Sequence, residues 1–138
     1  MNKKILMSTV VLLVVAMLAT SIGAVLARPF YQDISVEKAN RMIFSKGHHD
    51  LVVIDIRPVF MYTGGHIPGA INEPSLTLPA WIAGAGQSYL NNKIIVHCYL
   101  GFTSPDAADL LIEAGFKKVY NMEGGFKAWS DAEYPTVP

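Results

Sequence analysis

The chain has 138 residues and a mass of 15.1 kDa, which is enough for one domain with a hydrophobic core. Lys3 and Lys4 are two of its 11 basic residues, so the chain after residue 27 carries 9 basic against 11 acidic side chains, and no nucleic-acid partner is expected. Cys98 is the only cysteine, which excludes an internal disulfide bond and a cysteine-rich zinc site.

An uncharged apolar segment follows the first four residues. It runs from Ile5 to Ala27, and its 23 residues at 1.5 Å each span about 34 Å, enough to cross a bilayer core. Because Lys3 and Lys4 precede it, we expect the amino end in the cytoplasm and the remainder outside. Residues 1–27 are therefore predicted to be a transmembrane anchor, or a signal peptide cleaved after Ala27. Both interpretations predict an extracytoplasmic protein, in the periplasm or at the cell exterior, either membrane-anchored or secreted.

Segments typical of strands and helices alternate from residue 31 onward. Apolar β-branched runs predict strands, and apolar residues at helical spacing predict helices. In chain order we expect a strand at Tyr31–Ser35, a helix at Val36–Ser45, a strand at Leu51–Ile54, a helical turn at Pro58–Tyr62, a helix within Leu76–Gln87, a strand at Ile94–Val96, a helix after Thr103, a strand at Phe116–Asn121 and a last short helix near Trp129. This alternation predicts an α/β fold with a mainly parallel sheet.

Histidines occur in two predicted loops. His48 and His49 precede Asp50 in a polar turn, where neighbouring histidines are more often solvated than bound to a metal, and no metal site is predicted. His66 lies among glycines and a proline in a tightly constrained turn. We expect it to fasten this turn to the backbone, with a catalytic role as the alternative.

Cys98 lies on a short loop between a predicted strand and a predicted helix. The helix start is indicated by a hydroxyl N-cap, a proline and an acid in Thr103–Asp106, and Gly101 provides the backbone freedom for the turn. Unpaired backbone N–H groups and the helix dipole converge on such a loop, which lowers a thiol pKa and favours an anion. Asp55 and Cys98 both fall at carboxyl ends of strands, where parallel sheets bind ligands. The alternative is that Cys98 is a small hydrophobic residue at a strand end.

Five stretches in order together resemble one family. They are Ile54–Arg57, Gly65–Asn72, Cys98 with its loop, Glu113–Phe116 and Tyr120–Trp129. The set resembles the rhodanese (thiosulfate sulfurtransferase) family in its single-domain form, over about residues 31–130. The resemblance implies a rhodanese-like three-layer α/β domain at residues 30–138, with a mainly parallel central sheet flanked by helices and one N-terminal hydrophobic helix before it.

The resemblance also implies an activity and roles for individual residues. Cys98 would be the nucleophile that takes sulfane sulfur from thiosulfate or another persulfide donor and passes it to a thiol, such as that of a thioredoxin-like protein, or to cyanide in an assay. Asp55 would help to hold the loop, and Arg57 would have a structural or anion-attracting role. The loop that cradles the persulfide would consist of Tyr99, Leu100, Gly101, Phe102, Thr103 and Ser104. No cofactor and no metal are implied, and a monomer is expected; a non-catalytic sulfur-carrier or protein-binding module is the alternative.

The loop departs from its relatives in ways that bear on the substrate. Cysteine phosphatases carry an arginine at the sixth position after the cysteine, and here that position is Ser104, which disfavours a phosphatase. Many family members have basic residues in the loop where this chain has apolar ones, so a dianion such as thiosulfate is attracted less. Four further apolar residues are expected either to form a patch beside the pocket or to be buried in the core: Phe60, Met61, Trp81 and Ile82.

Overall fold

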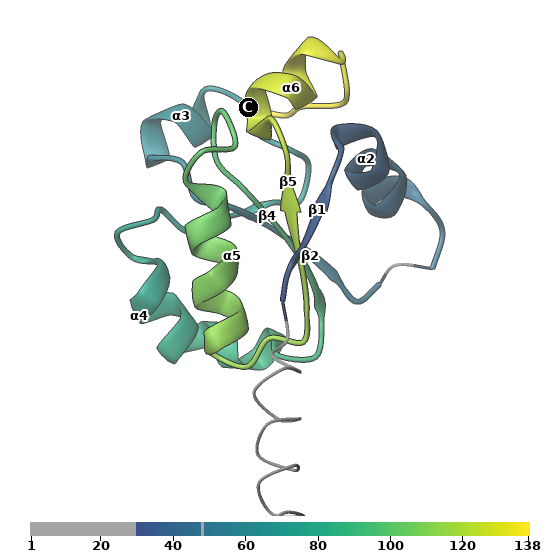
Figure 1. Cartoon of the computed structure of the whole chain (residues 1–138). Coiled ribbons are helices and arrows are strands. Elements are labelled where there is room, and N and C mark those ends of the chain that lie inside the picture. Colours follow the sequence, from purple (N-terminus) through teal and green to yellow (C-terminus); the bar gives the residue numbers. More distant parts are fainter. Residues whose placement is uncertain (1–29, 48) are drawn as a thin grey trace, which may run out of the picture.

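The computed structural model describes residues 30–47 and 49–138, which form alternating strands and helices (Figure 1). The elements in chain order are β1 (Gln32–Ile34), α2 (Val36–Phe44), β2 (Leu51–Asp55), α3 (Val59–Thr63), β3 (Ile71–Asn72), α4 (Leu78–Ala83), the 3-10 helix η1 (Ala85–Tyr89), β4 (Lys93–His97), α5 (Ser104–Glu113), β5 (Lys118–Met122) and α6 (Gly125–Asp131). The elements predicted from the pattern of the sequence are all present, and β3 and η1 are additional.

The five strands form one sheet in the order β1-β5-β4-β2-β3. Every paired strand is parallel to its neighbour, which confirms the predicted α/β class. Because parallel strands end at the same edge, Asp55 at the end of β2 pairs with His97 at the end of β4. Cys98 is the next residue, so its loop begins at the carboxyl edge of the sheet.

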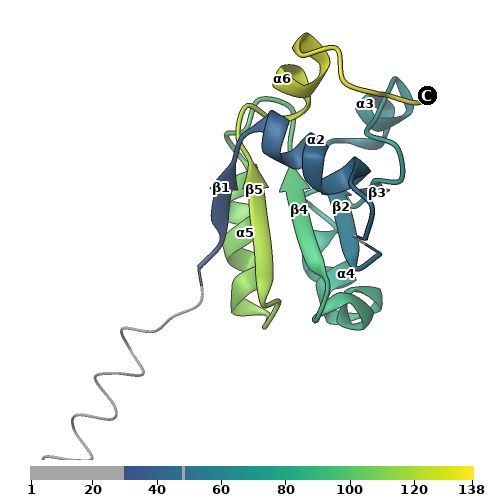
Figure 2. The ribbon, with the colours of Figure 1, turned by 90° about the vertical axis from the view of Figure 1, so that its right-hand side faces the viewer.

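Helices cover both faces of the sheet and produce three layers (Figure 2). Side chains of β4 alternate between two hydrophobic clusters, because successive residues of a strand point to opposite faces. Ile94 and Val96 pack in the cluster that contains the buried residues of α4 and α5. Ile95 packs in the other cluster, with Ala39 of α2 and Trp129 of α6. The three-layer arrangement that the resemblance implied is therefore confirmed for the described residues.

The predicted N-terminal hydrophobic helix, with residues 1–27 as anchor or signal peptide, lies outside the described residues. Among residues 30–47 and 49–138, no helix has the length and apolar character needed to span a bilayer.

Candidate active site

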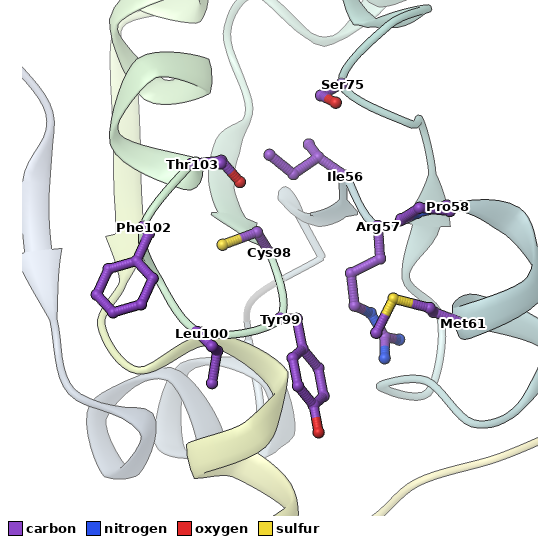
Figure 3. Close-up of a pocket in the computed structure, with 10 residues that line it drawn as sticks. All are labelled: Ile56, Arg57, Pro58, Met61, Ser75, Cys98, Tyr99, Leu100, Phe102 and Thr103. Atoms are coloured by element: carbon purple, nitrogen blue, oxygen red, sulfur yellow. The ribbon is translucent and has the colours of Figure 1, made fainter.

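A cavity of about 240 Å³ opens beside Cys98 at the carboxyl edge of the sheet (Figure 3). One wall comes from the segment after β2, from Met61 in α3 and from the segment before α4, and the other comes from the loop between β4 and α5. The lining residues are Ile56, Arg57, Pro58, Met61, Ser75, Cys98, Tyr99, Leu100, Phe102 and Thr103. Figure 3 shows Pro58 and Met61 on one side of Cys98, and Leu100 and Phe102 on the other. Four of the six predicted loop residues thus face the same cavity as the cysteine.

The sulfur of Cys98 is surrounded by hydrogen-bond donors. Cys98 is only 6% exposed, and the Gly101 N–H donates to its Sγ over 3.1 Å. Burial raises the pKa of the thiol, but the hydroxyl and backbone N–H of Thr103 and the backbone N–H of Ser104 outweigh burial and lower the pKa to about 7. The predicted convergence of backbone donors on the cysteine is therefore present. Its free thiol reaches the cavity and is a candidate nucleophile.

The hydroxyl of Thr103 does not have the capping role that the sequence predicted. Thr103 is the N-cap of α5, but its backbone has the helical values φ −106° and ψ −14°, and its side chain makes no capping hydrogen bond. A capping side chain normally requires an extended N-cap residue. The hydroxyl lies instead with the donors around the Cys98 sulfur (Figure 3). The prediction of a hydroxyl cap is therefore wrong, since this hydroxyl contributes to the site.

The Cys98 loop rests on the first turn of α6 and on the short segment that precedes it. The N–H groups of Phe126 and Lys127 donate to the carbonyl oxygens of Cys98 and Tyr99, both over 2.9 Å. Gly101 has φ +87°, and a Cβ there would lie 2.8 Å from the backbone nitrogen of Gly124. Glycine at position 101 is therefore required twice, for its backbone conformation and for the close approach of a second chain segment.

Gly125 brings the segment after β5 against the Cys98 loop. Its φ is +60°, and a Cβ would lie 2.5 Å from the Cys98 carbonyl oxygen. The sequence analysis quoted the glycine pair at 124 and 125 as part of a family motif but gave it no role at the site. The paired glycines after a strand were the available signal, because they mark a close backbone approach.

Asp55 and Arg57 form a buried ion pair next to the cavity. The Asp55 carboxylate accepts hydrogen bonds from the Arg57 backbone N–H, from Nε and from Nη2, the last over 2.6 Å. Arg57 Nη2 also donates to the Gly65 carbonyl, and the guanidinium lies 3.7 Å from the centre of the Phe126 ring. These hydrogen bonds order the segment after β2 and the turn at Gly65, whereas the Asp55 carboxylate makes none to the Cys98 loop.

His97 was not predicted as a site residue, yet it lies buried between Asp55 and Cys98. Its Nδ1 is 3.1 Å from the Cys98 carbonyl oxygen, and its Nε2 is 3.8 Å from the Asp55 carboxylate. Burial lowers the pKa of His97 despite the opposing effect of Asp55, so the imidazole is neutral and donates through Nδ1. A single histidine at the end of an apolar strand carries no sequence signal beyond its place before the cysteine.

His66 does not line the cavity. Its Nδ1 lies 3.1 Å from the Tyr62 carbonyl oxygen, and its ring stacks on the Tyr62 ring at 3.7 Å between centres. Its backbone exchanges two hydrogen bonds with Val137. These contacts match the expected structural role of fastening the turn.

The four apolar residues expected beside the pocket or in the core divide between the two places. Met61 lines the cavity, and Phe60 next to it is exposed. Ile82 is buried in the core, where Trp81 packs against the same cluster and stacks on Phe116. We use the name apolar rim for the large apolar side chains that line the cavity, which are Met61, Leu100 and Phe102.

The fold and the site together define a class of protein. A cysteine with a lowered pKa, on a loop of inward-facing N–H groups at the end of a parallel sheet, is suited to bind an anion or to transfer a group through sulfur. The sequence model of the rhodanese-like domain matches residues 35–132. The chain therefore belongs to the family of rhodanese-like domains, as the resemblance of its motifs predicted.

Two similar curated proteins share the name thiosulfate sulfurtransferase GlpE. The one from Shewanella oneidensis is 35% identical over 102 residues, which cover 74% of this chain and 95% of the relative. The one from Stutzerimonas stutzeri is 39% identical over 85 residues, which cover 62% of this chain and 74% of the relative.

Solved structures show the same fold. A protein of unknown function from Rhodopseudomonas palustris, described as a possible tyrosine phosphatase, matches with a TM-score of 0.71 and 28% identity, over 78% of this chain and 85% of its own. A rhodanese-related protein from Thermoplasma volcanium matches with a TM-score of 0.63 and 25% identity, over 78% of this chain and 98% of its own.

Proposed function

We propose that this protein is a sulfurtransferase that carries sulfane sulfur as a persulfide on Cys98. One observation carries the proposal: the Cys98 sulfur accepts a hydrogen bond from the Gly101 N–H over 3.1 Å, within a loop whose donors lower the pKa of the thiol to about 7. About half of the thiol is then ionised at neutral pH, and the thiolate is the form that attacks sulfur. The similarity to two proteins called thiosulfate sulfurtransferase supports the same reaction.

In the first step the Cys98 thiolate attacks the outer sulfur of the donor. With thiosulfate, an S–S bond forms to Cys98 while the S–S bond of the donor breaks, and sulfite leaves with the electron pair. The product is a persulfide anion on Cys98. Backbone N–H groups of Gly101, Thr103 and Ser104 face this sulfur, and we expect them to stabilise the persulfide as they stabilise the thiolate.

In the second step an acceptor thiolate attacks the outer sulfur of the persulfide. We propose the cysteine of a thioredoxin-like protein as the acceptor. The S–S bond to Cys98 breaks, its electron pair returns to Cys98 as a thiolate, and the acceptor leaves as a persulfide. Cyanide in place of the thiol leaves as thiocyanate. Neither step consumes an oxidant or a reductant.

An assay of sulfite and thiocyanate formation tests the proposal. The full chain, purified in detergent, is mixed with thiosulfate and cyanide, and we expect both products to form with turnover. The Cys98→Ser variant should form neither, and activity that survives in this variant rejects the mechanism. A non-catalytic sulfur carrier would instead gain the mass of one sulfur atom on Cys98 and keep it when cyanide is added.

A phosphatase is the second candidate, because one similar structure is described as a possible tyrosine phosphatase. Such an enzyme holds the phosphate dianion with an arginine in the cysteine loop. Residues 98–106 of this chain contain no arginine, and Ser104 occupies the position where phosphatases carry one. We therefore expect no hydrolysis of an aryl phosphate, and hydrolysis that depends on Cys98 would favour the phosphatase.

We also propose that the protein is a monomer outside the cytoplasm, with residues 1–27 as an anchor or a cleaved signal peptide. The described chain begins at Phe30, shortly before β1 starts at the amino edge of the sheet, whereas Cys98 lies at the opposite edge. An anchor before residue 30 would thus leave the active site facing away from the bilayer. In intact cells, a membrane-impermeant maleimide should label Cys98, and labelling only after lysis would contradict the location. Intact mass reports cleavage, and light scattering reports the oligomeric state.

A further inference from the structure

The mouth of the Cys98 cavity is unusually apolar for a site that would receive an inorganic anion. Among the residues that line the cavity, Phe102 is 81% exposed and Leu100 is 47% exposed. Together with Met61 they make up the apolar rim defined above. Large side chains that remain exposed around a reactive group, rather than scattered singly, are typical of a surface that binds an apolar partner.

The cavity also offers little positive charge. Arg57 alone among its lining residues carries a positive charge, and all of these residues belong to the described part of the chain. Its side chain is 2% exposed and is paired with the Asp55 carboxylate over 2.6 Å. Its Nη2 donates to the Gly65 carbonyl, and its guanidinium packs on the Phe126 ring. In Figure 3 the guanidinium points away from the Cys98 sulfur. Arg57 is thus held in structural contacts rather than offered to a donor.

The apolar rim and the paired state of Arg57 favour a donor with an apolar group over a dianionic donor. A dianion that approaches the Cys98 thiolate meets a like charge, and no uncommitted cation among the lining residues offsets the repulsion. An apolar group that approaches the same thiolate removes the surfaces of Leu100, Phe102 and Met61 from water, which is favourable. The cavity of about 240 Å³ is smaller than usual ligand pockets of about 300–1,000 Å³, which limits this group to a single ring or a short chain.

We propose that the sulfur donor is an organic sulfane compound with a compact apolar group and at most one negative charge, rather than thiosulfate. This inference rests on the sulfurtransferase activity proposed above. Organic thiosulfonates are the probe of this class. The Cys98 thiolate attacks the outer sulfur of the thiosulfonate and forms an S–S bond, the S–S bond of the donor breaks, and an organic sulfinate leaves with the electron pair. The apolar group of the donor then lies against the apolar rim.

Three donors separate charge from apolar area. Methanethiosulfonate and benzenethiosulfonate both carry one negative charge but differ in apolar size, and thiosulfate carries two charges. Persulfide formation on Cys98 of the full chain is followed by mass, and each kcat/KM with cyanide is divided by the rate constant of the same donor with free N-acetylcysteine. We expect benzenethiosulfonate to exceed methanethiosulfonate by about tenfold or more, since even one methylene in an apolar pocket contributes about that much. Thiosulfate should rank last.

Two sets of variants assign the preference to the residues named. Phe102→Ser changes an exposed side chain and should lower the ratio of benzenethiosulfonate to methanethiosulfonate at least about threefold, as expected for lost apolar contact. Leu100→Lys should raise kcat/KM for thiosulfate about tenfold at low salt by attracting the dianion. Leu100→Gln, of similar length but uncharged, is the matched control and should not produce this gain.

The outcomes distinguish the inference from the function on which it rests. If none of the three donors places sulfur on Cys98, the sulfurtransferase proposal fails. If all three do, but thiosulfate ranks first or the two thiosulfonates are equal, the sulfurtransferase stands and the apolar donor is rejected. Equal donor ratios in Phe102→Ser and in the unaltered protein would likewise overturn the role of the apolar rim.

Discussion

The hydroxyl of Thr103 should set the ionisation of Cys98. Thr103→Val keeps the shape of the side chain and removes only its hydrogen-bonding group, which is among the donors that lower the pKa of Cys98 to about 7. A hydrogen bond to a charged group contributes about 1.5–3 kcal/mol, and about 1.4 kcal/mol corresponds to one pKa unit. We therefore expect the pKa of Cys98 to rise by about one unit or more. About a tenth of the thiol, rather than about half, would then be ionised at pH 7.

The pH dependence of alkylation measures this change directly. Cys98 is the only cysteine, so the rate of iodoacetamide incorporation into the whole chain reports this one thiol. The midpoint of the rate against pH should lie near 7 in the unaltered protein and clearly higher in Thr103→Val. Sulfur transfer at pH 7 should fall by about fivefold, in step with the lost thiolate.

The conservative variant Thr103→Ser is the control, since it retains a hydroxyl at the same place. Its alkylation midpoint should stay near that of the unaltered protein. A Thr103→Val variant that is folded and still has its midpoint near 7 would refute the reasoning, because the hydroxyl would then contribute nothing to the thiolate.

Three further predictions concern the groups that support the site. Gly125→Ala should lower the free energy of unfolding by about 2 kcal/mol or more in urea titrations, because its Cβ would meet the Cys98 carbonyl oxygen at 2.5 Å in addition to the cost of positive φ. Asp55→Asn should cost about 3–5 kcal/mol by the same measurement, since it leaves the buried Arg57 charge unpaired. Burial lowers the pKa of His97, so the unfolded chain binds a proton there at a higher pH than the folded chain does. The contribution of the neutral imidazole to the free energy of unfolding should therefore be complete above about pH 6.5 and should decrease as the pH falls below that value. Urea midpoints measured between pH 7 and pH 5 will show this decrease.

Each of these predictions has a matched comparison. Gly69 has φ +77° but open space where a Cβ would go, so Gly69→Ala should cost less than Gly125→Ala. The exposed pair of Lys127 and Asp131 tests the effect of burial, and Asp131→Asn should cost far less than Asp55→Asn. When the pH is lowered from 7 to 5, the free energy of unfolding should decrease less in His97→Asn than in the unaltered protein. The opposite order in any comparison contradicts the corresponding argument.

Local patterns in the sequence were enough to predict most of the architecture. The β-branched run before Cys98 predicted β4, and the proline after Thr103 predicted the start of α5, because strand and helix signals depend on residues close in the chain. The motif set predicted the family, and Cys98 was singled out by its place between a strand and a helix start. Each of these inferences uses spacing along the chain and needs no knowledge of distant contacts.

The approach of distant segments decided the rest of the site. Gly125 supports the Cys98 loop although the two are separated by more than twenty residues, and the partners of Arg57 come from β2, from the turn at Gly65 and from α6. Trp81 joined the core while Phe60 stayed exposed, although both are apolar residues in short helices. The sequence by itself determined that the single cysteine lies on a tight loop between a strand and a helix, because backbone geometry and periodicity are local. Only the tertiary structure decided which donors face the sulfur and that the nearby arginine is already paired, because burial and charge pairing depend on which segments meet in space.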